Sequence, residues 1–218
     1  MNDLKNDIKD LKKTIFKITE KICDSDSKNQ TLAFKCFIQL ALHNAIRTLS
    51  NRYEHHGVPS FFFFFYIKIG DALIQYESKL ENLDLLNGDA LIDAVNQYNH
   101  IVKRNEPFLD ILSLLAEEIT ISQKQATKRG QFMTPPDLAI ALAELLKQED
   151  VPKSNKICDF CVGYGALILA SIGQTYKENS ERVKELEVIV NDIDPFMCNV
   201  VALQVIANTV NHNVDIKE

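Results

Sequence analysis

The sequence lacks an excess of basic residues. Its 24 lysines and arginines are outnumbered by 30 aspartates and glutamates, which gives a formal net charge of −6 and a pI near 5.4. Domains that hold nucleic acid by themselves commonly present a basic surface to the phosphates. The composition therefore excludes a global positive field. Any contact with nucleic acid must come from a local patch, a partner or a further portion of protein.

Cysteine is also scarce, and its five positions are scattered: Cys23, Cys36, Cys158, Cys161 and Cys198. An odd, scattered set argues against a disulfide framework and indicates a reducing compartment. Cys158 and Cys161 form a C-x-x-C pair, but no second pair of ligands follows at the spacing of a zinc site. We therefore expect no metal site, and we interpret the pair as small hydrophobic residues at a strand end.

Targeting and membrane-spanning segments are missing as well. The N-terminus, Met1 to Lys5, has no apolar core of the kind that a signal peptide needs. The longest apolar run, Phe61 to Ile67, is far shorter than the roughly 18 residues of a membrane-spanning helix. These absences predict a cytoplasmic protein that makes no contact with a membrane.

The N-terminal region shows helical periodicity. The first apolar stripe is a narrow seam that packs either within the protein's own helical domain or, as a coiled coil, against another subunit. Residues Asp24 to Ser27 supply caps for a second helix, which is apolar on more of its circumference and ends near His55. The seam consists of Leu4, Ile8, Leu11, Ile15, Ile18 and Ile22.

Further helices follow. The run Phe61 to Phe65 indicates a helix buried on several sides, with a strand as the alternative because aromatic runs favour sheet. Asn87 to Asp89 form a turn and a new cap, and Pro107 is predicted to open a helix that continues through Ile119. We therefore predict an all-α domain over residues 1–121. The polar, locally basic segment 122–130 is either a solvated linker or a loop beside a ligand cleft.

From Thr134 onward the pattern alternates between helix and strand. Thr134 is predicted to cap a helix with Pro135 at its first position. The expected order after it is a strand over 156–159, a helix from Ala166, a strand over 186–190 and a helix from Pro195, with a third strand beginning at Val214. Alternating β and α units with short connections indicate a parallel, doubly wound sheet over residues 122–218.

A glycine turn joins the first of these strands to its helix. Asp159 ends the apolar run, and Gly163 and Gly165 follow before the helical pattern begins. Glycine is needed where the backbone takes a positive φ or lies against a ligand. The amide groups at the start of the helix then point at the ligand's polar end. After the second strand, Asp192 can accept hydrogen bonds from ribose hydroxyls and Asp194 can cap the next helix.

Three segments, taken in order, resemble the start of N6-adenine-specific DNA methyltransferases, most closely the modification subunits of type I restriction systems. Gly130 to Pro135 differs from the family's Gly-Gln-Phe/Tyr-Phe-Thr-Pro only at Met133. The second segment, Asp159 to Gly165, keeps the acid and both glycines of Asp-Pro-x-Cys-Gly-x-Gly, with Tyr164 where a small residue is usual. In the third, Asp192 stands for the family's Glu and is followed by Asp194-Pro195.

The resemblance implies a binding site for S-adenosyl-L-methionine (SAM). Phe132 would pack at the cofactor, and Thr134 would hydrogen-bond its methionine end. Asp159 would accept from the methionine amine, and Asp192 from the ribose. The complete set of cofactor-binding residues implied is Gly130, Gln131, Phe132, Thr134, Asp159, Gly163, Gly165 and Asp192. The implied fold is an α-helical N-terminal domain followed by the N-terminal part of a Rossmann-like, class I SAM-dependent methyltransferase sheet.

The family's adenine-binding tetrapeptide, (Asn/Asp)-Pro-Pro-(Tyr/Phe), does not occur in the sequence. In the family this loop holds the flipped base. We therefore expect no catalytic residue here, and a SAM-binding portion that is inactive alone and reaches DNA through the full-length enzyme or a specificity subunit. The alternative is a non-catalytic relative that acts by protein–protein contact with a restriction–modification complex. A dinucleotide-binding module is less consistent, because a third glycine at Gly-x-x-Gly spacing is missing.

Association is also expected. A partial parallel sheet leaves an unpaired edge, and open edges recruit other strands. The apolar seam near the N-terminus offers a second surface. We predict a homo-oligomer or a protein partner.

Overall fold

The computed structural model describes residues 2–20, 26–55, 86–123, 133–147 and 155–214. The chain forms two compact units, residues 1–101 and 102–218. The phenylalanine run, the segment with Gly130, Gln131 and Phe132, and the third predicted strand beyond Val214 lie outside the described residues. No helix within the described ranges is both long enough and apolar enough to cross a membrane.

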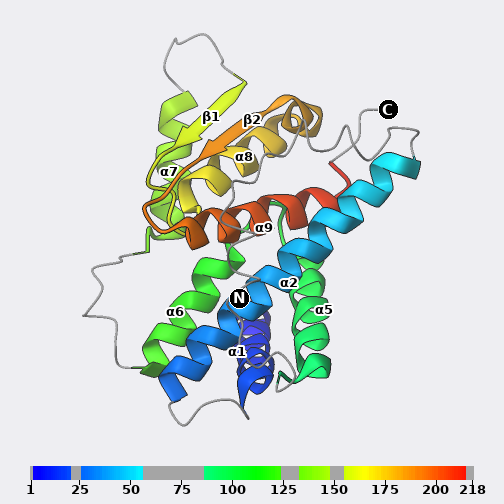
Figure 1. The fold of residues 1–218 in the computed structure, drawn as a ribbon. Coiled ribbons are helices and arrows are strands. Elements are labelled where there is room, and N and C mark those ends of the chain that lie inside the picture. The colour runs from blue at the N-terminus through cyan, green and yellow to red at the C-terminus, as the bar shows by residue number, and fades with distance from the viewer. Residues whose placement is uncertain (1, 21–25, 56–85, 124–132, 148–154, 215–218) are drawn as a thin grey trace. The chain divides into compact units, whose positions relative to one another are not determined.

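The described part of the first unit is helical, as the sequence predicts. Its helices are α1 (Asn2–Phe16), a short 3-10 helix η1 (Lys17–Thr19), α2 (Asp26–His55) and most of α5 (Gly88–Arg104) (Figure 1). Both ends of α2 and the start of α5 lie where the capping and turn residues of the sequence place them. In particular, the Asn87 side chain accepts a hydrogen bond of 3.1 Å from the Ala90 amide, which caps α5.

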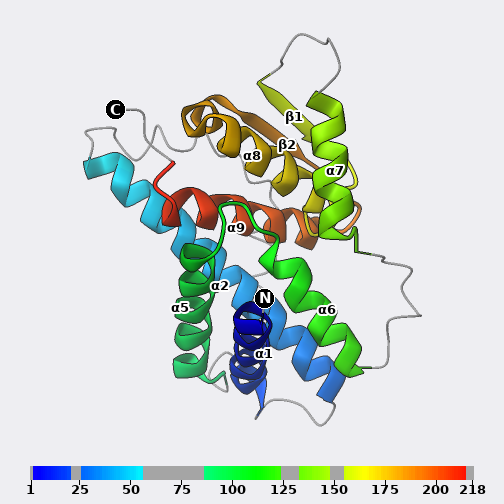
Figure 2. The ribbon, with the colours of Figure 1, turned by 180° about the vertical axis from the view of Figure 1, so that it is seen from behind.

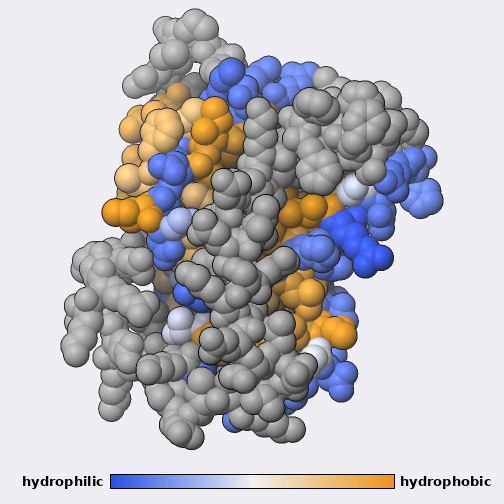
Figure 3. Space-filling model, viewed as in Figure 1, coloured by the Kyte–Doolittle hydropathy of each residue, from blue (hydrophilic) through white to orange (hydrophobic). Residues whose placement is uncertain are grey.

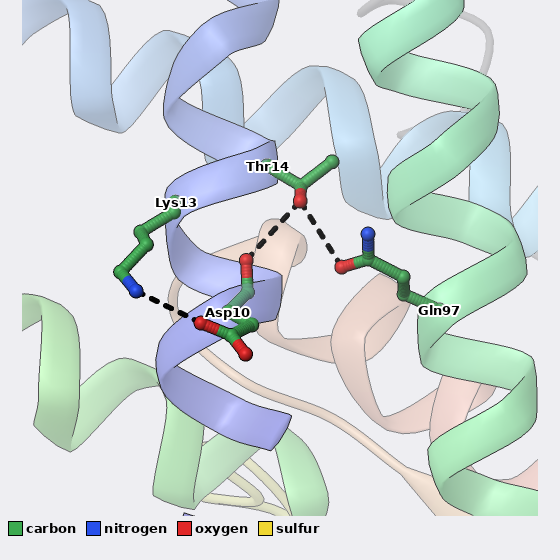
Figure 4. A network of polar contacts seen from close by, with 4 residues as sticks. All are labelled: Asp10, Lys13, Thr14 and Gln97. Atoms are coloured by element: carbon green, nitrogen blue, oxygen red, sulfur yellow. Dashed lines mark hydrogen bonds and ion pairs between the residues drawn. The ribbon is translucent and has the colours of Figure 1, made fainter. Parts of the chain in front are cut away.

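The seam of α1 packs inside this unit. Ile8, Leu11, Ile15 and Ile18 are all buried, and α1 lies against α2. Beside the seam, the Thr14 hydroxyl donates to Gln97 Oε1 on α5 over 3.1 Å (Figure 4). Of the two interpretations of the seam, packing within the helical domain is confirmed, because these side chains are already covered in a single copy of the chain.

The second unit holds the alternating part of the sequence. Its described elements after α5 are α6 (Ile111–Gln123), α7 (Pro136–Lys147), β1 (Lys156–Asp159), α8 (Ala166–Glu178), a 3-10 helix η3 (Ser180–Glu185), β2 (Glu187–Val190) and α9 (Pro195–Asn211). The order of strands and helices from α7 to α9 is the predicted one. The predicted domain boundary after residue 121 stays a prediction, since a compact packing unit is not by itself an independently folding domain.

The start of α6 differs from the sequence prediction. Pro107 does not open the helix: Phe108 has a φ of 64° and the helix begins at Ile111. The Phe108 amide donates to Asn208 Oδ1 on α9 over 2.7 Å, and the Asp110 side chain accepts from the Ser113 amide and caps α6. A positive φ cannot continue a right-handed helix, so the helix starts later.

The strands β1 and β2 pair in parallel, with Lys156 opposite Glu187 and Asp159 opposite Val190. In the views of Figure 1 and Figure 2, α8 lies along this pair and α7 lies beside α8, as their contacts require. The pair packs on a core that is built from α8, α9 and the segments next to them. The members of this core are Phe108, Val162, Ile168, Leu169, Ile172, Val201 and Val214, with Ile157, Val188 and Val190 packed against them. The described structure is thus mostly helical with a small two-stranded parallel sheet.

Helix α7 buries little of its apolar surface. It begins at Pro136, so the helix starts one residue later than predicted and Thr134 does not occupy the predicted cap position. Its buried positions are the small residues Ala139 and Ala143, whereas Leu145 and Leu146 are 59% and 69% exposed. Apolar surface is accordingly visible over α7 in Figure 3.

Candidate functional site

A cavity of about 330 Å³ lies where the carboxyl ends of β1 and β2 meet the first turns of α8 and α9. Ligands of open α/β sheets commonly bind at the carboxyl ends of parallel strands. The residues that line the cavity are Ser113, Met133, Thr134, Asp159, Cys161, Val162, Gly163, Tyr164, Ala166, Leu167, Asp192, Ile193 and Met197. All of them belong to the second unit.

The cavity brings together half of the residues predicted from the sequence. Thr134, Asp159, Gly163 and Asp192 line it, although they come from three separate segments of the chain. The predicted residues 130–132 lie outside the described ranges. Gly165 belongs to the same turn but is not a lining residue.

Gly163 joins the two loops that form the cavity. Its φ is +51°, and a Cβ added there would meet nothing within 4 Å. Its amide donates a hydrogen bond of 2.9 Å to Asp192 Oδ2, which lies 29 residues further along the chain. Gly163 is therefore needed for its backbone conformation, and its open Cβ position leaves room beside the cavity for a ligand.

Gly165 has a packing role beside the positive φ that the sequence suggests. Its φ is +95°, and an added Cβ would lie 2.8 Å from Val201 Cγ2 on α9. Side chains do not approach this closely, so the absence of a Cβ allows α9 to pack against the glycine turn. The structural requirement at Gly165 is close helix packing, and this position faces α9.

The acidic residues are held by backbone amides. Asp159 Oδ1 accepts from the Cys161 amide over 2.9 Å, and Asp192 Oδ1 accepts from the Asp194 amide over 2.9 Å. Asp194 Oδ1 accepts from the Phe196 amide and caps α9, as predicted. Each of these carboxylates is fixed in orientation, and Asp159 and Asp192 keep free lone pairs for a ligand.

The cavity is electrostatically negative. Among the residues that the structure describes, two carboxylates line it and no lysine, arginine or histidine does. The nearby Cys198 responds to this charge: burial raises the pKa of its thiol, and the negative charges of Asp192 and Asp194 raise it further against the hydrogen bond to the Asp192 backbone. The site therefore favours a ligand with positive charge and hydrogen-bond donors over an anionic one.

A buried polar network lies behind the glycine turn. The side chain of Gln204, on α9, donates to Asp110 Oδ1 over 2.8 Å and to the Tyr164 carbonyl over 2.9 Å. Its Oε1 accepts from the Leu112 amide over 3.0 Å. Burial raises the pKa of the Asp110 carboxyl, and hydrogen bonds from Ser113 and Gln204 act in the opposite direction. The network connects the first turn of α6 to the middle of the glycine turn.

Several lining residues carry no sequence signal. Ser113 occurs in an ordinary helical pattern, and Met133, Ile193 and Met197 are unremarkable apolar residues whose place beside the cavity depends on the fold. Cys158 lies on β1 and Cys161 just after it, as predicted, but neither is buried as a small hydrophobic residue would be: both are exposed, and Cys161 lines the cavity. Within the described residues, no cluster of three or more metal-ligating side chains occurs.

Comparison with known families shows to which protein family the chain belongs. The family model described as N-6 DNA Methylase matches residues 110–218, which is half of the chain. The protein belongs to the N-6 DNA methylase family. No curated protein and no solved structure matches the chain.

The N-6 DNA methylase match begins at Asp110, the buried cap of α6. It therefore includes every residue that lines the cavity. The predicted membership of the N6-adenine DNA methyltransferases is confirmed over the second half of the chain. It points to a DNA methyltransferase-like function, and family members generally use SAM as the methyl donor.

Proposed function

We propose that this chain is the SAM-binding portion of an adenine-N6 DNA methyltransferase of a restriction–modification system. In this proposal the second unit is the first part of a Rossmann-like, class I methyltransferase sheet. The N-6 DNA methylase match and the predicted succession of strands and helices support the fold assignment. The negative cavity at the carboxyl ends of β1 and β2 is the observation that carries the ligand assignment.

The charge of the cavity distinguishes SAM from the dinucleotides that bind to similar turns. SAM carries a sulfonium and an ammonium against one carboxylate, whereas dinucleotides carry a pyrophosphate. Asp159 and Asp192 would repel a pyrophosphate, and no basic residue in the described part of the lining offsets their charge. A cation with several donors matches the free lone pairs of these carboxylates.

Each predicted residue has a place in this proposal. Asp192 accepts from the ribose hydroxyls, and Asp159 accepts from the methionine ammonium. Gly163 allows close approach of the ligand, and Thr134 hydrogen-bonds the methionine end; all four line the cavity. Gly165 supports the site by its packing against α9. Phe132, Gly130 and Gln131 complete the set by resemblance.

The bound cofactor would supply an electrophilic methyl group on its sulfonium. The residues described here bind and orient that cofactor, but the chain contains no (Asn/Asp)-Pro-Pro-(Tyr/Phe) tetrapeptide to hold a flipped adenine. We therefore propose that the chain alone transfers no methyl group to DNA, and that DNA is bound through further parts of the enzyme or a specificity subunit. Incorporation of labelled methyl into adenine by this chain would contradict the proposal.

Calorimetry with SAM tests the cofactor site. Asp192→Asn keeps the size of the side chain but removes its charge, and we expect it to weaken SAM binding about tenfold, the usual cost of losing a hydrogen bond to a charged group. Asp137→Ala is the matched control, because Asp137 is an exposed acid in the first turn of α7 outside the cavity lining. NAD should bind no better than free adenosine. Unchanged SAM affinity of Asp192→Asn would reject the site.

One observation supports a second candidate function. The exposed leucines of α7 give this unit an apolar surface, which suits a non-catalytic relative that docks on a restriction–modification complex. Absence of SAM binding together with stable association with another protein would favour this alternative.

A further inference from the structure

The hydroxyl of Ser113, a lining residue of the cavity, is hydrogen-bonded to a buried acid. The residue is only 6% exposed, yet it contributes to the cavity wall. Its hydroxyl donates to Asp110 Oδ2 over 2.5 Å. Because the only hydroxyl proton is used in this bond, the oxygen of Ser113 can act toward the cavity only as an acceptor.

Hydrogen-bond donors surround both oxygens of the Asp110 carboxyl group. Its Oδ1 accepts from the Ser113 amide over 3.1 Å and from Gln204 Nε2 over 2.8 Å, and its Oδ2 accepts from the Ser113 hydroxyl. All three groups donate to the carboxylate and act against burial, the larger influence, which raises the pKa of Asp110; the Ser113 hydroxyl has a carboxylate oxygen as its acceptor. The direction of the Ser113 hydroxyl is therefore set by its surroundings.

The same network indicates which end of a ligand Ser113 faces. Gln204 donates both to Asp110 and to the carbonyl of Tyr164, in the middle of the glycine turn. Ser113 is thus connected to the turn that Asp159 begins, whereas Asp192 belongs to the loop after β2. In the proposed function the first of these loops holds the amino-acid end of the ligand.

We propose that Ser113 is a further ligand-binding residue of this site, whose oxygen accepts a hydrogen bond from the ammonium group of a bound cation, and that Asp110 positions it. The assignment rests on the proposed SAM site. Gln204 is the second positioning residue, since it fixes the Asp110 carboxylate and the Tyr164 carbonyl together. An acceptor polarised by a buried carboxylate suits an ammonium better than it suits a neutral donor.

The test measures the affinities of two probes by calorimetry on the full chain. SAM carries the ammonium, and 5′-methylthioadenosine has the nucleoside and a thioether but no ammonium. Ser113→Ala is expected to weaken SAM binding about tenfold and to leave 5′-methylthioadenosine binding unchanged. Ser171→Ala is the control, because the Ser171 hydroxyl bonds the Leu167 carbonyl on α8 and Ser171 is not a lining residue.

The variant Asp110→Asn tests whether Asp110 positions the Ser113 hydroxyl or only stabilises the fold. Two donors face Oδ1, so the amide oxygen of the new Asn takes that side and its NH₂ group faces Ser113. That NH₂ would occupy the Ser113 oxygen and turn the hydroxyl proton toward the cavity. We expect Asp110→Asn to weaken SAM binding at least as much as Ser113→Ala, and to have no further effect when Ser113 is already Ala.

The outcomes separate this proposal from the cofactor assignment. If Asp192→Asn weakens SAM binding and Ser113→Ala does not, only the assignment of Ser113 is wrong. If Ser113→Ala weakens both probes equally, the ammonium contact is wrong. If the wild-type chain binds neither probe, the cofactor site and the Ser113 contact fall together. Additive effects of the two substitutions would overturn the positioning role of Asp110.

Discussion

Gly165 and Val201 approach so closely that no side chain fits between them. A Cβ on Gly165 would lie 2.8 Å from Val201 Cγ2, and the glycine has a φ of +95°. The contact joins the turn after β1 to α9, two parts of the chain that both contribute residues to the lining of the cavity. The second glycine of the turn is thus required for packing between elements that are distant in sequence.

Gly165→Ala should destabilise the protein more than Gly163→Ala. At Gly163 an added methyl meets open space, so only the positive φ opposes it, at a cost of roughly 1 kcal/mol. At Gly165 the clash with Val201 adds to the unfavourable φ, and we expect a total of roughly 2 to 4 kcal/mol. Urea unfolding of both variants measures the difference.

The combination with Val201→Ala provides the control for this prediction. Removing the two methyl groups of Val201 creates room, so the double variant should lose less stability than the sum of the two single variants. Equal losses of stability for the two glycine variants would show that Val201 can move away from the added methyl group without a cost in free energy.

The reactivity of the two exposed thiols, Cys158 and Cys161, can report whether a ligand occupies the cavity. Cys161 lines it, whereas Cys158 lies on the exposed face of β1 outside the lining. Saturating SAM should slow alkylation of Cys161 by iodoacetamide severalfold and leave Cys158 unchanged, as mass spectrometry of the labelled peptides would report. Equal protection of both residues, or of neither, would argue against SAM in this cavity.

Cys36 should show the opposite behaviour in the first unit. Burial on α2 raises the pKa of its thiol from 9.0 to about 11. The thiolate is the reactive form, so Cys36 should resist alkylation at pH 8 until the protein unfolds. Labelling in the presence and absence of urea measures this difference.

The same shift predicts a pH dependence of stability. The folded-state pKa lies above the unfolded one, so the contribution of Cys36 is fully present below about pH 9 and is lost as pH rises through about 11. The loss should amount to roughly 2 to 3 kcal/mol, since the shift is about two pKa units. Cys36→Ala should lose less stability than the wild type between these two pH values, and parallel curves would contradict the assignment.

Association of the chain remains a prediction, now based on a different surface. The seam of α1 is buried in the first unit, but Leu145 and Leu146 on α7 are exposed. Light scattering across a dilution series should show a mass above that of the monomer, and Leu145→Glu with Leu146→Glu should reduce it. Deleting α1 should not reproduce that effect by itself. A monodisperse wild-type monomer at high concentration would contradict the prediction.

Local signals in the sequence determined β1, α8, β2 and α9. Each has a boundary residue whose effect extends over a few positions: the glycine turn before α8, and Asp194 with Pro195 before α9. The same signals predicted the negative cavity residues Asp159 and Asp192, because parallel strands bring their carboxyl ends to one edge. The N-6 DNA methylase affiliation followed from these short segments too.

Only the tertiary structure decided the start of α6, the packing role of Gly165 and the place of Ser113. Phe108 takes a positive φ where its amide meets Asn208, 100 residues away, and no local propensity contains that contact. Likewise, Ser113 reaches the cavity because Gln204 and Asp110 hold α6 against α9. Such contacts depend on how distant segments pack. The periodic pattern of a helix shows which residues share a face, but it does not specify which other element that face will contact.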